Sequence, residues 1–478
     1  MKEKIIKDLV FGFIHIDDGV AEVIDHRSFQ RLKNISQLTA HHLFPSANHT
    51  RFEHSLGVMQ LAVRFIEALK CKIIELAGKE HYEKCYIHLK YAALLHDVGH
   101  APLSHVGEAF FDKNNIKENI KALLGHDRDN SYCNESASAH ELMSCYVILK
   151  NFKSLLERIF NSNNTPLDIE YILRMITGSC YSDSSMWLYN MTIELLNSKS
   201  IDVDKLDYLM RDNFMTGEVA PKINLDRLLF SITIDGMKKI AYTPTGISSV
   251  VSIIDCRDFL YLWVYNHHVV VYTDYLYKEI IKHLISERNT ISKQKLSYPE
   301  YFSCKAIADY YITDDDIRTV INKEAIDTDS QYSKLVLSQL LERKFLKPLW
   351  KTIFEFNSFM SKSFLDSRQR HRIIDIVTSD KAYEKLGELV NKILYECHLQ
   401  SGQLFIIPRS NKFYAMSRET EFYIETKRYG DVDLKDIMPE RRFDEKYSNI
   451  VFYVFAPTER LNEVEQALVS ILKRDYML

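Results

Sequence analysis

Apolar residues recur at helical spacing along most of this chain, and this pattern limits the folds open to it. Between residues 20 and about 290 they fall three or four positions apart, as at Val20, Val23 and Ile24. Glycine (14 residues) and proline (10 residues) are scarce in a chain of 478 residues, against average usages of about 7% and 5%. Such spacing places apolar side chains on one face of a helix. The sequence therefore predicts a mainly α fold.

Three parts of the chain depart from the helical pattern. Residues 112–138 are polar, and we expect a lid or a loop there. Residues 228–250 contain SITIDGMKKIAYT, which predicts a short hairpin that turns at Asp235 and Gly236. After residue 401 the runs LFIIP, KFYAM, FYIET and IVFYVFAP are typical of short strands, and a last helix is expected at roughly 459–473. These features predict a small α+β subdomain at the carboxyl terminus.

Charge and composition argue against several kinds of partner. Lys and Arg (61) nearly balance Asp and Glu (65), so nothing in the net charge of −4 indicates a nucleic-acid or anionic membrane surface. The eight cysteines form no CxxC pair, which argues against a zinc knuckle and a disulfide framework. The first residues do not read as a signal peptide, and no apolar window of about 18 residues occurs. We expect a cytoplasmic protein that does not contact membranes.

The densest group of histidines carries the strongest chemical signal. The segment HDVGHAPLSH brings His96, Asp97, His100 and His105 close together in sequence. An adjacent His and Asp can offer an imidazole nitrogen and a carboxylate oxygen to one cation. Mixed ligation of this kind suits Mg, Mn, Fe, Co, Ni or Zn. The motif therefore predicts a divalent metal site.

Two residues elsewhere in the chain are candidates for completing the ligand set. His54 stands in TRFEHSLG at the start of a predicted helix, and Asp204 stands in SIDVDKLDYLMRD on another. The predicted metal ligands are thus His54, His96, Asp97 and Asp204. A second His-Asp pair at 126–127 lies in the polar stretch without a following histidine, so we interpret it as a solvated loop.

The order of these residues resembles the HD superfamily of metal-dependent phosphohydrolases. Together with FQRLKNISQL, FPSANHTRFEHSLGV and YNHH, the motifs are similar to those of the deoxynucleoside triphosphate triphosphohydrolases of bacteria and mammals. The resemblance runs from about residue 4 to 290. It implies a helical HD-domain core at 1–290, after which we expect a helical extension at 291–400 and the α+β subdomain at 401–478.

The resemblance implies a reaction that converts a deoxynucleoside triphosphate to deoxynucleoside and inorganic triphosphate. The substrate-binding residues that it implies are Arg51, Lys205 and Arg257 for the phosphates, Tyr208, Gln37 and Asp212 for the sugar, and Tyr265 and His267 near the base. Helical geometry agrees in part, because Asp204, Tyr208 and Asp212 recur every four residues and so share one helix face. One helix can then serve both metal and sugar.

Proton transfer needs a separate group, because the departing 5′-alkoxide is a poor leaving group. His105 is our candidate for the general acid, since an ordinary histidine pKa of about 6.5 suits that task near neutral pH. The resemblance places His100 near the α-phosphate. It also implies that His140 in SAHELMS and Glu108 in SHVGEAFF support His105.

Residues near the amino terminus match positions that form a nucleotide effector site at a subunit interface in the family. They are Lys4, Ile5, Asp25, Gln30 and Lys33. The family pattern has an arginine at position 33, and the lysine here lacks its planar, bidentate contact, so the effector's identity stays open. The match implies a homo-oligomer, a tetramer or hexamer.

Two other functions stay open. The metal ligands alone are also compatible with an HD phosphatase or phosphodiesterase that acts on nucleoside monophosphates or cyclic nucleotides. A nucleic-acid-binding regulatory protein with an inactive HD site is the alternative from another class, although the near-neutral charge does not favour it.

Overall fold

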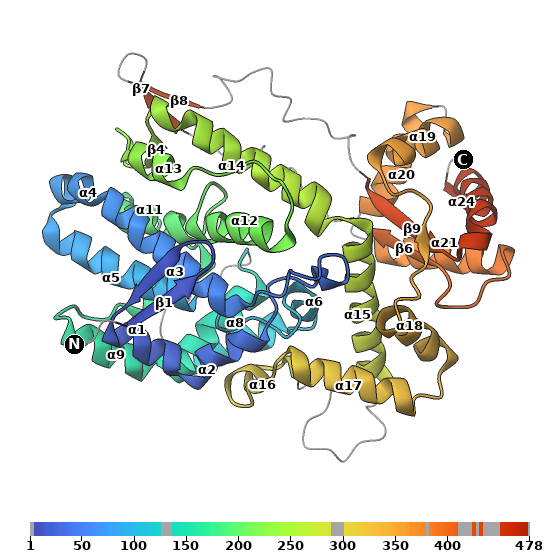
Figure 1. Ribbon diagram of the computed structural model, residues 1–478, viewed down its shortest axis with the longest axis horizontal. Helices are drawn as coiled ribbons and strands as arrows, with labels where there is room; N and C mark the ends of the chain where they lie inside the picture. Colours follow the sequence, from blue (N-terminus) through green and yellow to red (C-terminus); the bar gives the residue numbers. More distant parts are fainter. Residues whose placement is uncertain are drawn as a thin grey trace. The chain divides into compact units, whose positions relative to one another are not determined.

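A computed structural model describes most of the chain. The described residues are 4–125, 136–287, 301–364, 366–378, 382–409, 423–426, 430–433 and 450–476. Within them most residues are helical, which confirms the mainly α fold class (Figure 1). The chain divides into two compact units, each built from separated segments: the first from 1–261, 288–318 and 416–441, and the second from 262–287, 319–415 and 442–478. The boundaries at 290 and 400 stay a prediction.

The first unit is mostly helical and begins with a hairpin. Its strands are β1 (Lys4–Asp8), β2 (Gly12–Ile16), β3 (Ile232–Ile234), β4 (Ile240–Tyr242), β7 (Tyr423–Thr426) and β8 (Gly430–Asp433). Its helices are α1 (Asp18–Asp25), α2 (Arg27–Gln30), α3 (Arg51–Ala68), α4 (Lys70–Ala77), α5 (Lys79–Leu95), α6 (His105–Glu108), α7 (Lys113–Leu124), α8 (Ala139–Val147), α9 (Lys153–Ser162), α10 (Ile169–Thr177), α11 (Trp187–Leu196), α12 (Val203–Thr216), α13 (Leu225–Ser231), α14 (Ile247–Leu260) and α16 (Cys304–Ala308).

Helix α3 forms the centre of this unit and packs against α5 and α12 (Figure 1). Its start is fixed by a capping box, in which the Thr50 side chain accepts from the first turn and the Glu53 carboxylate accepts from the Thr50 amide. Because the helix starts at Arg51, both Arg51 and His54 lie in its first turn. The apolar face behind them is buried, with Val58, Leu61 and Ala62 inaccessible to solvent.

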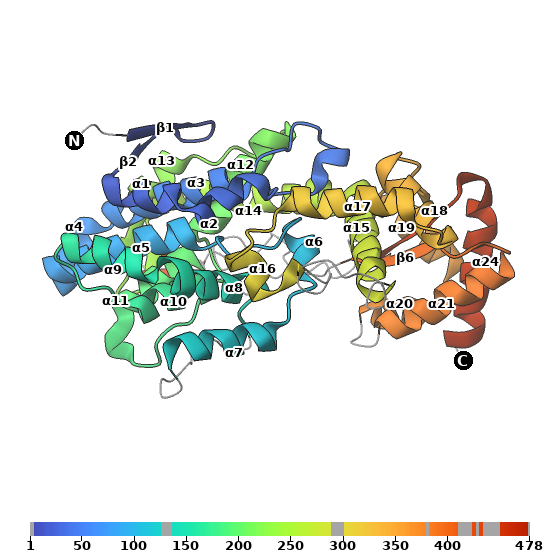
Figure 2. The same ribbon diagram turned by 90° about the horizontal axis from the view of Figure 1, so that it is seen from below.

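One expectation about the first unit was wrong and another is confirmed. The polar stretch at 112–138 was expected to be a lid or loop, but 113–124 form α7, which packs against α8 (Figure 2), and 126–135 lie outside the described residues. Asp112 caps this helix, and Ile116 and Ile120, four residues apart, are buried beneath it. The hairpin predicted at 228–250 is present as β3 and β4.

The second unit combines helices with a three-stranded sheet in the order β5, β9, β6. Its strands are β5 (Lys347–Pro348), β6 (Phe405–Pro408) and β9 (Phe452–Ala456), and its helices are α15 (His268–Glu287), α18 (Gln331–Leu341), α19 (Ile353–Ser363), α20 (Ser367–Thr378), α21 (Ala382–Glu396) and α24 (Leu461–Tyr476). Helix α17 (Asp314–Asp327) begins in the first unit and ends in the second. Trp350 anchors the core, stacks on Phe359 and donates its indole N–H to the Phe452 carbonyl at 2.9 Å.

The carboxy-terminal strands take part in two different sheets. Strands β6 and β9 pair with each other in the second unit, whereas β7 pairs with β4 in the first unit, in register Tyr242 to Ile424. The predicted α+β character is therefore confirmed, while the strand KFYAM lies outside the described residues. Helix α24 confirms the predicted last helix.

Two further observations concern the described residues alone. None of their helices has the length and apolar character needed to cross a membrane. Every cysteine among them is a free thiol.

Candidate active site

His54 and His96 direct their Nε2 atoms toward each other at one place in the first unit. His54 lies on α3, and His96 directly follows α5; their Nε2 atoms are 3.3 Å apart. Nδ1 of His54 hydrogen-bonds Oδ2 of Asp207 at 2.7 Å, and Nδ1 of His96 hydrogen-bonds the carbonyl oxygen of Ala93 at 2.8 Å. Since these acceptors take the Nδ1 protons, each Nε2 can offer its lone pair to a cation, which at His54 would take the place of a proton.

Two carboxylates complete this group. Nε2 of His54 lies 3.0 Å from Oδ1 of Asp204 and 3.6 Å from Oδ2 of Asp97, and Nε2 of His96 lies 3.6 Å from Asp97 and 3.7 Å from Asp204. Asp204 comes from the first turn of α12. The structure thus brings together all four predicted metal ligands, which come from three separate parts of the sequence.

The electrostatics of this group favour a positive charge at its centre. Burial alone would lower the pKa of His54, but hydrogen bonds to Asp204 and Asp207 raise it to about 10. Burial would raise the pKa of Asp97, yet the Arg51 guanidinium and neighbouring imidazoles hold it well below its usual range. Two imidazole nitrogens and two carboxylates suit a divalent metal such as Mn, Fe, Co, Ni, Zn or Mg. The donor set therefore fits such an ion.

A second cluster is organised by one carboxylate. Glu108 lies 3.0 Å from Nδ1 of His105 and 2.9 Å from Nδ1 of His140. The backbone amides of Ala139 and His140, at the start of α8, also donate to Glu108. Burial would lower the pKa of His140, but the Glu108 carboxylate raises it to about 9. His140 is therefore protonated near neutral pH and paired with Glu108.

His100 joins the second cluster by stacking. Its ring lies 4.6 Å from that of His140 at an angle of 17°, and its side chain is fully buried. Among the described residues, neither ring nitrogen of His100 has a hydrogen-bond partner. Burial and the nearby Arg51 cation hold its pKa well below the usual range. His100 is thus a neutral imidazole.

His100, His105 and His140 lie close enough to hold a second metal ion, but their ring orientation argues against it. The lone pair of an imidazole nitrogen lies in the plane of its ring. Two stacked rings at 17° cannot both direct a lone pair at one ion. The arrangement is better suited to holding and moving protons.

The three predicted phosphate-binding cations are all at least partly buried and contact other groups. Arg51 donates to Oδ2 of Asp97 at 2.6 Å and to Oγ of Ser104 at 3.1 Å. Lys205 donates to the carboxylate of Asp202 and to the Ser198 carbonyl. Arg257, on α14, lies over the ring of Tyr261 at 4.5 Å.

The predicted sugar-binding residues include an interaction that the sequence did not indicate. Oδ1 of Asp212 lies 2.7 Å from Nε2 of His49, and both side chains are buried. Gln37 is buried beside them, and its backbone N–H donates to the His49 carbonyl. Tyr208 lies on α12 between Asp204 and Asp212, and burial raises its pKa well above its usual range. In the sequence, the one feature that could have indicated a role for His49 is its position two residues before Arg51.

The remaining predicted residues fall in two places. Lys4 lies 3.8 Å from Asp25, and Lys33 donates to the Gln30 side chain at 2.8 Å; Ile5 is exposed on β1. These contacts join the candidate effector residues in pairs. Tyr265 and His267 belong to the second unit, and their role near the base stays a prediction.

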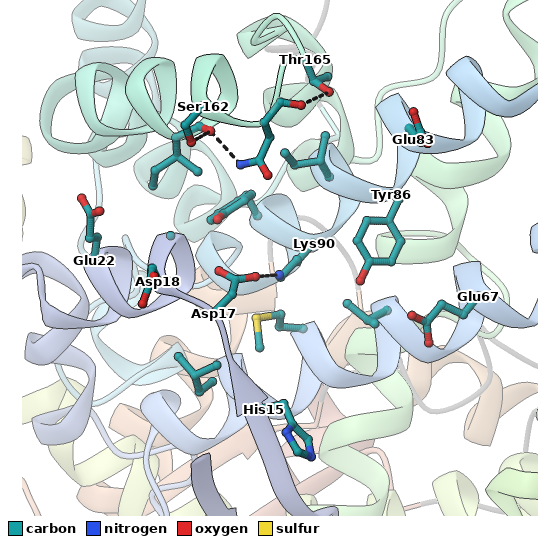
Figure 3. A pocket seen from close by; sticks show the side chains of 18 of the residues that line it. His15, Asp17, Asp18, Glu22, Glu67, Glu83, Tyr86, Lys90, Ser162 and Thr165 are labelled. Atoms are coloured by element: carbon teal, nitrogen blue, oxygen red, sulfur yellow. Dashed lines mark hydrogen bonds and ion pairs between the residues drawn. The ribbon is translucent and has the colours of Figure 1, made fainter. Parts of the chain in front are cut away.

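A cavity of about 1120 Å³ lies elsewhere in the first unit, between α1, α3, α5 and α9 (Figure 3). None of the predicted site residues lines it. Two pairs of its charged side chains contact each other, Asp17 with Lys90 and Arg158 with Glu22. It is therefore separate from the histidine clusters.

Comparison with known families identifies the domain that holds both clusters. Residues 51–210 match the model of the HD domain. This span contains the four candidate metal ligands and the second cluster. HD domains bind divalent metals, in agreement with the donor set described above.

Known relatives extend the similarity beyond that domain. A deoxynucleoside triphosphate triphosphohydrolase SAMHD1 homolog of Dictyostelium discoideum is 31% identical over 56% of this chain and 46% of its own length. The deoxynucleoside triphosphate triphosphohydrolase SAMHD1 of Bos taurus is 31% identical over 56% of this chain and 45% of its own. The chain thus spans about half the length of these curated relatives.

A solved structure agrees over nearly the whole chain. The crystal structure of a hypothetical protein from Aquifex aeolicus superposes with a TM-score of 0.63 and covers 98% of this chain and 100% of its own. At 21% sequence identity, this likeness shows a shared fold.

Proposed function

We propose that this protein, whose residues 51–210 form an HD domain, is a divalent-metal-dependent hydrolase that cleaves deoxynucleoside triphosphates into deoxynucleoside and inorganic triphosphate. The observation that carries this proposal is the convergence of His54, His96, Asp97 and Asp204 beside a carboxylate-linked histidine cluster. One group suits a metal and the other suits proton transfer.

The metal site has a defined role in such a reaction. His54, His96, Asp97 and Asp204 would hold the ion, which when bound supplies Lewis acidity at a phosphoryl oxygen and activates water. The chain itself keeps the imidazoles oriented through Asp207 and the Ala93 carbonyl. Both Nε2 atoms therefore face the same point, 3.3 Å apart.

His105 is the candidate proton donor to the leaving 5′-oxygen; desolvation by its surroundings lowers its pKa from the ordinary value expected from the sequence, while the hydrogen bond to Glu108 acts to raise it. Its Nδ1 is held by Glu108, and its side chain is 68% exposed, so a substrate can reach the opposite ring nitrogen. Glu108 is fixed in turn by His140 and by the start of α8. A positioned general acid of this kind typically contributes about 10²–10⁴-fold to the rate.

The choice of a triphosphate substrate rests on the nearby cations and on the relatives. Arg51 hydrogen-bonds the predicted ligand Asp97, and Lys205 directly follows the predicted ligand Asp204 in the sequence. With Arg257 they would neutralise the polyphosphate, and each charge-assisted hydrogen bond could contribute about 1.5–3 kcal/mol. Two relatives bear the name deoxynucleoside triphosphate triphosphohydrolase. Tyr208, Gln37 and Asp212 would contact the sugar.

Product analysis tests the proposal directly. The purified protein is incubated with each deoxynucleoside and ribonucleoside triphosphate, with Mg²⁺ or Mn²⁺, and the products are separated by chromatography. We expect deoxynucleoside and intact triphosphate. Release of monophosphate and pyrophosphate would contradict the proposal, and turnover of only monophosphates or cyclic nucleotides would support the phosphatase alternative.

A further inference from the structure

Asp8, at the end of strand β1, uses its two carboxylate oxygens for different purposes. Oδ1 accepts hydrogen bonds from the amides of Val10 at 2.8 Å and Phe11 at 2.9 Å, which fixes the turn of the amino-terminal hairpin. Oδ2 accepts from Nη1 of Arg211 at 2.8 Å. The Asp8 side chain is only 3% exposed. The hairpin is thereby tied to helix α12 by a buried ion pair.

Arg211 extends this connection toward the metal site. Its Nε and Nη2 donate to the two oxygens of Asp207, at 2.9 Å and 3.0 Å. Oδ2 of Asp207 also takes the contact from Nδ1 of His54 at 2.7 Å. A continuous series of buried hydrogen bonds therefore runs from the hairpin to a candidate metal ligand.

The packing leaves this series little freedom. Gly57, three residues after His54 on α3, faces the Asp207–Arg211 pair so closely that a Cβ there would overlap Oδ1 of Asp207 and Nη2 of Arg211. Arg211 and Asp207 are 2% and 0% exposed, so water cannot readily replace a lost partner. Without Asp8, the buried Arg211 guanidinium would keep Asp207 as its one carboxylate partner among the described residues.

This arrangement matters because the group that hydrogen-bonds a histidine's second nitrogen sets the ring's orientation and its strength as a ligand. Asp207 is the group that hydrogen-bonds the second ring nitrogen, Nδ1, of His54. Arg211 in turn holds both Asp207 oxygens in place. Asp8 in turn holds Arg211 and adds a negative charge to the surroundings of the cation site.

We propose that Asp8 is a positioning residue which, through Arg211 and Asp207, orients His54 and sets the metal affinity of the site. This inference rests on the proposed function, in which His54 is a metal ligand. It assigns the amino-terminal hairpin a part in metal binding. The sequence does not indicate this part, because the hairpin lies far from the HD motif along the chain.

The test uses Co²⁺ as a spectroscopic probe on the full-length protein. Asp8→Asn keeps an oxygen for the amides of Val10 and Phe11 but removes the charge that pairs with Arg211. We expect Co²⁺ to bind about fivefold to tenfold more weakly, and the visible Co²⁺ spectrum to change as His54 loses its fixed orientation. Asp207→Asn, one step nearer the metal, should weaken binding by about 10- to 100-fold.

Asp17→Asn is the matched control. Asp17 also accepts from a backbone amide, that of Val20, and pairs with a cation, Lys90, but Lys90 does not lead to a metal ligand. We expect this variant to keep the wild-type affinity for Co²⁺ and its spectrum. Circular dichroism and melting without metal verify that each variant is folded.

A double-mutant cycle with Arg211→Gln separates a connected series from independent effects. If Asp8 acts through Arg211, Asp8→Asn should not weaken Co²⁺ binding further in the Arg211→Gln protein. Wild-type affinity in a folded Asp8→Asn protein, or an equal loss in both backgrounds, would overturn the inference while leaving the proposed function standing. A wild-type protein that binds no Co²⁺ would overturn both.

Discussion

The Glu108 carboxylate lies 2.9 Å from Nδ1 of His140 and accepts the backbone amide of the same residue. This contact joins the short helix α6, which begins at His105, to the start of α8. Burial would raise the pKa of Glu108, but His140 and His105 hold it far below its usual range. The carboxylate therefore stays ionised and available to His105.

Replacing Glu108 by Gln should change the protonation of His140. Without the carboxylate, burial acts unopposed and the pKa of His140 should fall from about 9 to the ordinary 6.5 or below. The pair stabilises the folded state most between about pH 4.3 and 6.5, the ordinary pKa values of glutamate and histidine; this contribution is lost as the pH rises through about 9 and declines as the pH falls below about 4.3. Turnover should fall by tenfold or more, since His105 loses its support. NMR titration of the imidazole and initial rates measure both effects.

Glu157→Gln is the control for that experiment, because Glu157 is an exposed residue of α9. It should leave both the His140 titration and turnover unchanged. An unchanged His140 titration in Glu108→Gln would contradict the assigned ion pair.

Substituting Gly57 by Ala should weaken metal binding by displacing Asp207, which orients His54. The added methyl group would overlap Asp207 and Arg211, and overpacking of this kind costs about 1–3 kcal/mol of folding free energy. Gly387→Ala on α21 is the matched control, because no atom lies within 4 Å of a Cβ built there. That change should be neutral or slightly stabilising, since alanine favours a helix. Denaturant melts and Co²⁺ titrations of both variants would show whether only Gly57 matters.

The metal ligands could be predicted because three of them lie in short local motifs. His96 and Asp97 are adjacent, and His54 falls in the first turn of a helix whose capping signal, Thr50 and Glu53, is local. Such signals need no knowledge of the tertiary structure. The same applies to the hairpin at Asp235, where turn chemistry alone indicates the fold.

The supporting residues could not be predicted, since each depends on contacts between distant segments. Asp207 meets His54 across 153 positions, Arg211 meets Asp8 across 203, and His49 meets Asp212 across 163. One sequence shows Asp207 only as another helical acid. Helix α7 was missed because its polar composition hid two buried isoleucines.

The amino-terminal residues lead to a prediction about assembly. Lys4 and Asp25, which lie 3.8 Å apart and are largely exposed, are available to a neighbouring subunit or a nucleotide. We expect sedimentation to give a tetramer or hexamer that Lys4→Ala weakens. A monomer whose size does not respond to added nucleotides would contradict both the interface and the effector site.

His88 should make the stability of the protein depend on pH. Its side chain is fully buried; Nδ1 donates to the Lys84 carbonyl, and Nε2 accepts the Asp168 amide, which requires the neutral ring. Burial lowers its pKa to about 4. Between pH 6.5 and 4 the unfolded state therefore binds more protons, and this site should cost about 3 kcal/mol of stability as the pH falls through that range.

The measurement compares the free energy of unfolding of wild type, His88→Gln and His81→Gln between pH 4.5 and 8. His81 is an exposed residue of the same helix, so its replacement should leave the acid-induced loss in place. His88→Gln should reduce that loss. Identical pH profiles for wild type and His88→Gln would rule out the neutral, buried state assigned here.

The last prediction separates metal binding from proton transfer within one motif. Asp97→Ala or Asp204→Ala should lose both bound metal and turnover, because each removes an anionic ligand that no neighbour replaces. His105→Ala should keep the metal, since its ring is held by Glu108 and belongs to the second cluster. Its turnover should fall by about 10²–10⁴-fold while substrate still binds. Elemental analysis, a nucleotide-binding measurement and initial rates distinguish the roles. Metal loss in His105→Ala would make His105 a ligand, whereas near-normal turnover with metal retained would assign the acid to another residue.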